Sequence, residues 1–226
     1  MSNATAQPLA IDIDTQTKVS ALWLRPVDAR AACTLAHGAG AGMTHAFMAA
    51  AAEGLAQRGI ASLRYQFAYM ERGSKRTDAP ALAYAVVRAA VATARTLAGD
   101  LPLFAGGKSF GGRMTSQAQA AQPLAGVRGI FFIGFPLHPA GKPSDARAAH
   151  LAEVALPMLF LQGTRDELAE LALLRPVVER LGERAQLELL EHADHAFHVP
   201  ARSGRTDAQT LADLLDRLAG WMPGNP

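Results

Sequence analysis

A serine flanked by glycines stands where an apolar run gives way to a helical pattern. Residues 107–111 are Gly-Lys-Ser-Phe-Gly; the apolar residues 103–105 precede them, and a helical pattern over residues 113–121 follows. This arrangement is typical of a nucleophile held on a tight strand-to-helix turn, where a larger side chain at either glycine would collide with neighbouring backbone. Ser109 is therefore the candidate nucleophile.

Two glycine-containing patterns in the chain are similar to nucleotide-binding motifs, and the sequence excludes both. Gly-Lys-Ser could end a phosphate-binding P-loop, but that loop needs a glycine where the chain has Pro102, which has no amide hydrogen. Gly38 and Gly40 could begin a dinucleotide loop, but its third glycine would be Met43. We expect no nucleotide and no other cofactor.

A serine hydroxyl is a weak nucleophile at neutral pH, so it needs a base and a group that orients the base. Asp166 follows the apolar residues 158–161 and is the candidate orienting acid. Residues 191–198 follow another apolar run, 185–190, and contain three histidines, one of which we expect to be the base. The chain order serine, aspartate, histidine is that of an α/β-hydrolase.

Other roles for the acid and the histidines stay open at this point. His192, His195 and His198 are three residues apart and could hold a metal, although no HExxH pattern or cysteine pair accompanies them, so no metal is expected. Asp166 could be a turn carboxylate, in which case Asp145 would replace it. Asp194 is a weaker candidate because it adjoins a histidine in sequence.

A run of small residues, His-Gly-Ala-Gly-Ala-Gly at 37–42, follows the apolar residues 31–36. Small side chains let backbone amides come close to a bound oxygen. We expect the amides of Phe110, just after the nucleophile, and Ala39 to form an oxyanion hole, with Gly40 as second choice for the latter.

Apolar runs alternate with helical patterns along the chain, which predicts an eight-stranded, mostly parallel sheet flanked by helices. Loops after parallel strands share one edge of the sheet, so the candidate residues can meet there. The expected strands are 9–14, 19–25, 31–36, 60–65, 103–105, 130–133, 158–161 and 185–190. The expected helices are 47–58, 84–97, 113–121, a stretch ending with 176–181, and 211–221. The first two strands are expected to form an antiparallel hairpin. No long insertion follows residue 133, so we expect no lid domain.

Composition limits the possible classes of protein. With 226 residues, half of them apolar, we expect a single domain over residues 1–226. The 22 basic and 20 acidic residues are spread along the chain, so we expect no nucleic-acid partner. We expect no apolar stretch of membrane-spanning length and no membrane partner; residues 1–8 lack the features of a signal peptide, which predicts a cytoplasmic protein.

Two smaller features have unremarkable explanations. Cys33 is the only cysteine and lies in an apolar run, so we expect a buried thiol in the core rather than a nucleophile. Arg64, Arg72, Lys75 and Arg76 form a local basic excess, which we interpret as a solvated loop. If that loop bordered the site, it would favour an anionic substrate.

The chain resembles the small lidless α/β hydrolases near the dienelactone hydrolases. The resemblance is closest to the group that includes testis-expressed protein 30 and a subunit of the animal NSL histone-acetyltransferase complex. The matching segments are residues 37–40, 64–71, 107–114, 134–139, 162–166 and 194–197. The resemblance implies that His195 is the base, since the family's histidine directly follows an aspartate. Dienelactone hydrolases use a cysteine where this chain has Ser109, which argues against dienelactone as the substrate.

Together these observations predict a serine hydrolase that cleaves an ester or thioester of a small-molecule acyl substrate. Ser109 would attack the acyl carbonyl, His195 would move the proton and Asp166 would orient His195. Because some members of the resembling group are binding subunits, a noncatalytic binding module is the alternative. A small serine peptidase or amidase is a further one.

Overall fold

The computed structural model describes residues 5–222, so the first four and last four residues of the expected domain lie outside the described part. One eight-stranded sheet runs through the molecule in the order β1-β2-β4-β3-β5-β6-β7-β8. Its strands are β1 (Gln7–Asp12), β2 (Lys18–Leu24), β3 (Ala31–Ala36), β4 (Ile60–Tyr65), β5 (Leu103–Lys108), β6 (Val127–Ile133), β7 (Met158–Gly163) and β8 (Ala185–Leu190). The helices are α1 (Ala46–Ala56), α2 (Ala68–Glu71), α3 (Pro80–Ala98), α4 (Phe110–Ala121), α5 (Leu171–Leu181) and α6 (Asp207–Trp221), with 3-10 helices η1 (Ala146–Glu153), η2 (Gly182–Arg184) and η3 (Ala201–Ser203).

The strand directions confirm the predicted mostly parallel sheet. β1 pairs antiparallel with β2, and β2 pairs antiparallel with β4. From β4 through β3, β5, β6 and β7 to β8, every neighbouring pair is parallel. The carboxyl ends of six strands therefore lie along one edge.

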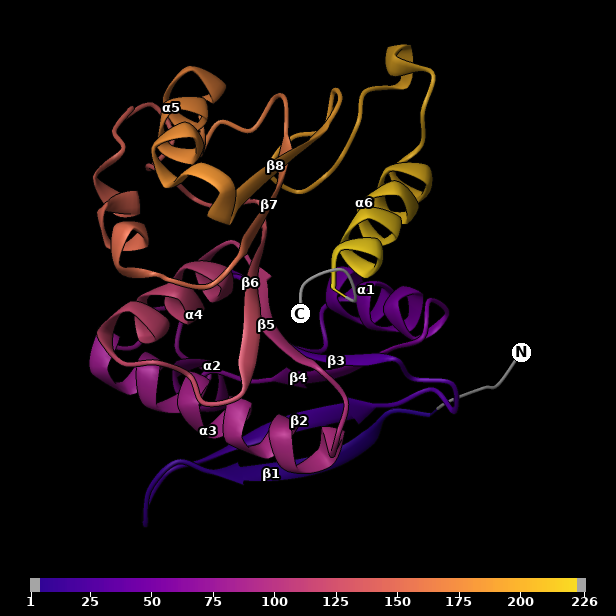
Figure 1. Cartoon of the computed structure of the whole chain (residues 1–226), viewed down its shortest axis with the longest axis vertical. Helices are drawn as coiled ribbons and strands as arrows, with labels where there is room; N and C mark the ends of the chain where they lie inside the picture. The colour runs from indigo at the N-terminus through magenta and orange to yellow at the C-terminus, as the bar shows by residue number, and fades with distance from the viewer. Residues whose placement is uncertain (1–4, 223–226) are drawn as a thin grey trace.

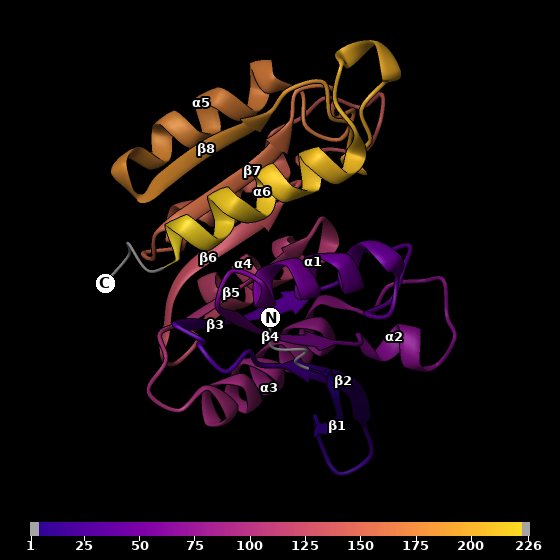
Figure 2. The ribbon, with the colours of Figure 1, turned by 90° about the vertical axis from the view of Figure 1, so that its right-hand side faces the viewer.

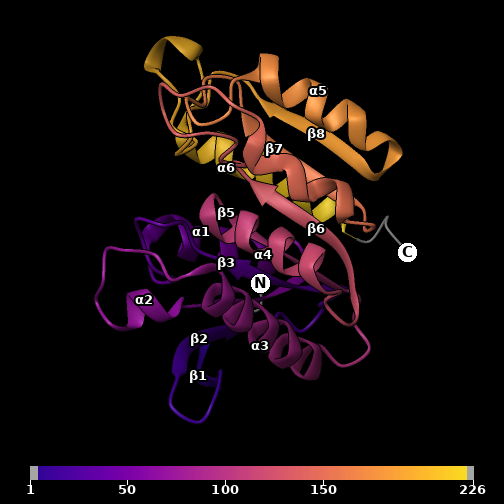
Figure 3. The same cartoon turned by 90° about the vertical axis from the view of Figure 1, so that its left-hand side faces the viewer.

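Helices cover both faces of the sheet (Figure 1). Figure 2 shows α1 and α6 on one face, and Figure 3 shows α3, α4 and α5 on the other. Two cores result, one on each side of the sheet. Phe131 and Phe132 are adjacent in β6 but belong to different cores, because successive side chains of a strand point to opposite faces.

Helix α3 corrects one expectation from the sequence. It has 19 residues and is apolar enough to cross a membrane by length and composition, so the prediction that no such stretch exists is wrong. In the structure this helix packs on α4 and on strands β3, β4 and β5. Val86, Val87 and Ala90 are among its buried side chains. Its apolar composition is thus explained by its packing against the sheet.

The turn that carries Ser109 is tighter than the sequence pattern predicted. β5 continues to Lys108, and α4 begins at Phe110 rather than at residue 113. The prediction placed Gly106 and Gly107 in the turn rather than in the strand, and glycine is depleted in strands in general. Here the chain needs glycine, since a Cβ at Gly106 would overlap the carbonyl oxygen of Phe131.

Two other helices begin earlier than predicted. α3 begins at Pro80 instead of residue 84, and proline suits the first turn because its missing amide hydrogen has no helical partner there. α6 begins at Asp207 instead of residue 211. Thr206 and Gln209 form a capping box at its start, with reciprocal bonds between side chain and backbone. In α6 the apolar periodicity begins at Leu211, after the capped first turn, which explains the later start predicted for this helix.

Candidate active site

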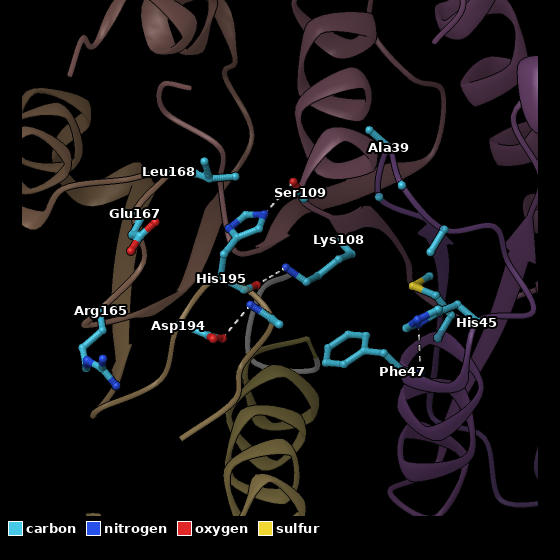
Figure 4. A pocket seen from close by; sticks show the side chains of 15 residues that line it. Ala39, His45, Phe47, Lys108, Ser109, Arg165, Glu167, Leu168, Asp194 and His195 are labelled. Atoms are coloured by element: carbon cyan, nitrogen blue, oxygen red, sulfur yellow. Dashed lines mark hydrogen bonds between the residues drawn. The ribbon is translucent and has the colours of Figure 1, made fainter. Parts of the chain in front are cut away.

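The loops that follow β5, β7 and β8 meet at the carboxyl edge of the sheet. They bring together three of the residues that the sequence singled out: Ser109 directly after β5, Asp166 after β7 and His195 after β8. Figure 4 shows Ser109 and His195 turned toward each other, with Ala39 on the opposite side of the cavity. Their convergence follows from the parallel sheet, because strand order rather than sequence distance decides which loops are neighbours.

Ser109 occupies a sharp turn in the backbone. Its φ of 50° and ψ of −116° lie in a region where the backbone of any residue other than glycine is strained. Its amide donates a 3.0 Å hydrogen bond to the carbonyl of Ile133, and its carbonyl accepts one of 3.1 Å from the amide of Arg113. These bonds hold the strained residue between the sheet and the first turn of α4.

The flanking glycines allow the elbow to sit against β3. A Cβ at Gly111 would lie 2.6 Å from the Cβ of Ala36 and from the carbonyl oxygen of His37. A Cβ at Gly107 would overlap the carbonyl oxygen of Ala36. The steric reason predicted for these glycines is therefore present in the structure.

A continuous chain of hydrogen bonds joins the three polar side chains. His195 Nδ1 lies 2.7 Å from Asp166 Oδ2, and His195 Nε2 lies 2.8 Å from Ser109 Oγ. A carboxylate only accepts, so Nδ1 carries the hydrogen and Nε2 has a free lone pair toward the serine hydroxyl. The Asp166 side chain is completely buried, whereas a quarter of the His195 side chain is exposed. The arrangement can move a proton from Ser109 to His195.

Gln162 is a participant that the sequence analysis did not single out. Its Nε2 donates a 2.5 Å hydrogen bond to Asp166 Oδ2, and its Oε1 accepts one of 2.9 Å from the amide of Phe135. The amide of Leu168 donates a 2.8 Å bond to the other carboxylate oxygen. Asp166 is therefore held from three sides. The signals in the sequence were the position of Gln162 at the end of the apolar run 158–161 and its place in the matching segment 162–166.

The small-residue loop at 37–42 is oriented from behind by two aromatic side chains. His37 Nε2 accepts a 3.0 Å bond from the amide of Phe67, so its Nδ1 donates to the carbonyl of Gly38 at 2.7 Å. Burial lowers the pKa of His37, which favours this neutral form. The Tyr69 hydroxyl donates a 2.9 Å bond to the carbonyl of Ala39.

These bonds determine which way the loop amides point. In a planar trans peptide the N–H is directed opposite to the preceding C=O. Since the carbonyls of Gly38 and Ala39 are bonded to His37 and Tyr69, the amides of Ala39 and Gly40 point away from that side, and both residues line the cavity. The amide of Phe110 belongs to the first turn of α4, where no helical carbonyl is available to it.

A second clamp holds the far end of the same loop. The amide of Met43 donates a 2.8 Å bond to Gln66 Oε1, and the carbonyl of Met43 accepts a 3.2 Å bond from Arg64 Nη1. Arg64 is only 5% exposed, so its interpretation as part of a solvated loop is wrong. Burial lowers the pKa of Arg64 from its usual value. The Arg64 guanidinium therefore binds the backbone of this loop rather than solvent.

The rest of the basic segment keeps to the surface. Arg72 forms a 2.7 Å ion pair with Asp78, and Lys75 and Arg76 are exposed. None of the four basic residues lines the cavity beside Ser109. They therefore provide no local reason to expect an anionic substrate.

A cavity of about 790 Å³ opens beside Ser109. Its walls include the apolar side chains of Phe47, Met48 and Leu168, and the charged side chains of Arg165 and Glu167 (Figure 4). This volume lies within the range of about 300–1,000 Å³ that is typical of small-molecule sites.

The alternatives left open by the sequence have other partners. Asp194 lines the cavity, but its Oδ1 accepts bonds from the amides of Ala196 and His198. Asp145 pairs with Arg180 at 3.0 Å, and His198 Nδ1 lies 2.8 Å from Asp207 Oδ2. The three neighbouring histidines do not converge, and within residues 5–222 no group of three metal-ligating side chains is gathered. Cys33 is buried in β3, as predicted, and burial raises the pKa of its thiol to about 12.

Comparisons with known proteins agree with this geometry. Residues 29–223 match the family model described as alpha/beta hydrolase domain. A dienelactone hydrolase from Anabaena variabilis has 20% identity and a TM-score of 0.78 over 99% of each chain. A lidless α/β serine hydrolase from Xanthomonas campestris has 20% identity and a TM-score of 0.73 over 100% of this chain and 99% of its own. An esterase domain from Rhodothermus marinus has 15% identity and a TM-score of 0.73 over 98% of this chain and 99% of its own.

At these identities the similar structures establish the fold. The predicted resemblance to lidless α/β hydrolases near the dienelactone hydrolases is confirmed. The narrower link to testis-expressed protein 30 and the NSL-complex subunit stays a prediction.

Proposed function

Because the chain belongs to the α/β-hydrolase domain family, we propose that it is a serine hydrolase that cleaves carboxylic esters or thioesters. One observation carries the proposal: the hydrogen-bond chain from Asp166 through His195 to Ser109, with distances of 2.7 Å and 2.8 Å. A buried acid, an imidazole in the correct tautomer and a strained serine are the parts that nucleophilic catalysis requires.

In the proposed reaction Ser109 Oγ attacks the acyl carbonyl while His195 Nε2 takes the hydroxyl proton. Collapse of the tetrahedral intermediate breaks the bond to the alcohol or thiol, which leaves with the proton from His195. Water then attacks the acyl-serine ester, with His195 again as base, and releases the carboxylic acid. Asp166 keeps Nδ1 protonated and stabilises the imidazolium in both steps.

The oxyanion of each tetrahedral intermediate would lie between the amides of Ala39 and Phe110. Two features support this assignment: the carbonyls of Gly38 and Ala39 are bonded away from the cavity, and α4 begins at Phe110. The positive end of the helix dipole adds to the field at that position. Gly40 is the second choice because its amide has the same direction as that of Ala39.

The geometry favours catalysis over the noncatalytic alternative. A binding module has no need to keep the base within proton-transfer distance of the serine, whereas His195 Nε2 lies 2.8 Å from Ser109 Oγ beside an open cavity. A peptidase or amidase would use the same residues, so amide substrates belong in the test.

We also propose that residues 1–226 form one domain, that the substrate is a small acyl compound and that the protein acts in the cytoplasm without nucleic-acid or membrane partners. The single sheet from β1 to β8 and the single family match support one domain. The size of the cavity supports a small substrate. The lone, buried, free thiol of Cys33 suits a compartment in which thiols stay reduced.

The proposal is tested by labelling the purified protein with a fluorophosphonate and by assaying p-nitrophenyl esters of short to long acyl chains. We expect labelling and ester turnover in the wild type and neither in Ser109→Ala. Ser203→Ala is a matched control, because Ser203 is a half-buried serine in η3 outside the cavity, and it should react like the wild type. Labelling that persists in Ser109→Ala, or a wild type that turns over no ester or thioester, would overturn the proposal.

A further inference from the structure

Lys108 directly precedes Ser109 and has no part in the mechanism described so far. Its side chain crosses from the end of β5 to the loop after β8, where its Nζ donates a 2.5 Å hydrogen bond to the main-chain carbonyl of His195 (Figure 4). The two residues are 87 positions apart in sequence. The sequence pattern around Lys108 is similar to that of a P-loop lysine, but in the structure its Nζ binds the loop that carries the base.

The loop around His195 is otherwise held by bonds within itself and by bonds to the loop after β7, where the amide of Arg165 donates to the carbonyl of Ala193 at 2.9 Å. Asp194 Oδ1 accepts bonds of 2.8 Å and 2.9 Å from the amides of Ala196 and His198. The amide of Phe197 donates to the carbonyl of Asp194 at 3.0 Å. These bonds shape the loop but do not attach it to the strand that carries the serine. The bond from Lys108 makes that attachment.

Two aromatic rings hold the lysine side chain in place. Its Nζ lies 5.1 Å from the ring centroid of Phe197 and 6.0 Å from that of Phe47. The two rings stack on each other with centroids 6.1 Å apart. Ring faces attract an ammonium group, so the position of Nζ is restricted by contacts beyond the single hydrogen bond.

We propose that Lys108 is a positioning residue for the proposed hydrolysis: its ammonium fixes the main chain of His195 so that the imidazole stays within proton-transfer distance of Ser109. The inference rests on the proposed function. Because Lys108 and Ser109 are consecutive, the bond to His195 and the 2.8 Å Oγ to Nε2 contact form two attachments between the same two segments. The base is thereby held in place before a substrate enters.

The charge of Lys108 adds a pH dependence to this role. Burial lowers the pKa of Lys108 to about 8, while the carboxylates of Asp166 and Asp194 oppose the shift. The other titratable side chains that line the same cavity are His195, His45 on the segment before α1, and Arg165 and Glu167 on the loop after β7. A neutral amine donates a weaker hydrogen bond and loses its attraction to the rings. Activity should therefore decline as the pH rises through about 8.

The test compares Lys108→Met, Lys108→Arg and the wild type in ester turnover and fluorophosphonate labelling from pH 6 to 10. Methionine keeps the length and removes the donor, and we expect kcat to fall about 10- to 100-fold with little change in KM, as misplaced catalytic groups do. Arginine keeps the donor and the positive charge, so Lys108→Arg should retain much of the wild-type rate, and its activity should decline at a higher pH than that of the wild type. Lys75→Met, at an exposed lysine, is the matched control and should behave like the wild type.

The inference is overturned if Lys108→Met keeps the wild-type rate and its alkaline decline, even if its melting temperature falls. If Lys108→Met does not fold, NMR titration of Lys108 in the wild type replaces it. The pH at which its Nζ loses its proton must then match the alkaline decline in the rate of labelling, and a mismatch overturns the inference.

A direct readout separates this inference from the proposed function. The Nδ1 proton of His195, bonded to Asp166, should give a resolved NMR signal in the wild type and a broadened or absent one in Lys108→Met or, if that variant does not fold, in the wild type at pH 10. If the wild type hydrolyses no ester or thioester and is not labelled by the fluorophosphonate, the proposed function fails. The NMR signal still decides whether Lys108 positions His195. An unchanged signal overturns the inference.

Discussion

The hydroxyl of Tyr69 donates a 2.9 Å hydrogen bond to the carbonyl oxygen of Ala39, across 30 positions of sequence. This bond lies behind the loop that follows β3 and holds the Ala39–Gly40 peptide so that the N–H of Gly40, the second-choice oxyanion donor, faces the cavity side. The same hydroxyl lies 3.4 Å from the carbonyl oxygen of Gly38, in the peptide that carries the N–H of Ala39. Tyr69 is fully buried, and burial raises the pKa of its phenol to about 12, so it remains a donor through the working pH range.

We therefore predict that Tyr69→Phe lowers kcat about 3- to 10-fold while KM changes little, because one neutral hydrogen bond contributes about 0.5–1.5 kcal/mol. Steady-state kinetics with a p-nitrophenyl ester measures this split, and weaker inhibition by a boronic acid, which forms a tetrahedral adduct, should accompany it. Tyr84→Phe is the control, because its hydroxyl donates a 3.3 Å hydrogen bond to Gln117 and neither residue lines the cavity. Equal effects of the two substitutions would contradict the role given to Tyr69.

Asp166→Asn should reduce kcat by about 10³- to 10⁴-fold, since an amide in this position favours the wrong tautomer of His195. Asp145→Asn removes the other acid that the sequence allowed, and its exposed ion pair with Arg180 should contribute little. Rates of fluorophosphonate labelling measure both variants. A large loss in Asp145→Asn and a small one in Asp166→Asn would reverse the assignment.

Gly111→Ala should destabilise the fold by about 1–3 kcal/mol, because the added methyl group would lie 2.6 Å from Ala36 Cβ and from the His37 carbonyl oxygen. Alanine normally stabilises a helix relative to glycine. Gly220→Ala in α6, where nothing lies within 4 Å of the new Cβ, should instead raise stability by up to about 1 kcal/mol. Thermal unfolding distinguishes the two signs, and a stabilised Gly111→Ala would refute the close packing of the elbow.

His150 makes the stability of the fold depend on pH. Its Nε2 lies 2.7 Å from Ser116 Oγ, and burial together with the nearby Arg113 lowers its pKa from 6.5 to about 4. Between these values the unfolded chain binds a proton that the folded chain does not, so the free energy of unfolding falls as the pH drops from about 6.5 to about 4.

His150→Gln should weaken this dependence, since glutamine does not titrate. Urea midpoints measured at pH 7, 5.5 and 4.5 test the difference between the variant and the wild type. Parallel curves for the two proteins would show that His150 does not contribute.

Much of the site could be predicted from the sequence because its signals are local. The turn at Ser109 depends on its neighbouring glycines, and Asp166 and His195 each follow an apolar strand. The alternation of strands and helices predicted a parallel sheet, in which loops far apart in sequence meet at one edge. Choosing His195 among the neighbouring histidines needed the family resemblance, because spacing alone did not separate them.

The contacts that hold these groups in place were decided by the tertiary structure. Gln162 bonds to Asp166, Tyr69 bonds to Ala39, and Lys108 bonds to His195. No role was predicted for Tyr69 from the sequence, and Lys108 was part of a P-loop pattern that Pro102 excluded. Two of these bonds join residues 30 and 87 positions apart, and each depends on one side-chain rotamer in the packed fold. Local pattern determines which elements form and what chemistry they carry, whereas the packing between elements determines which polar groups meet.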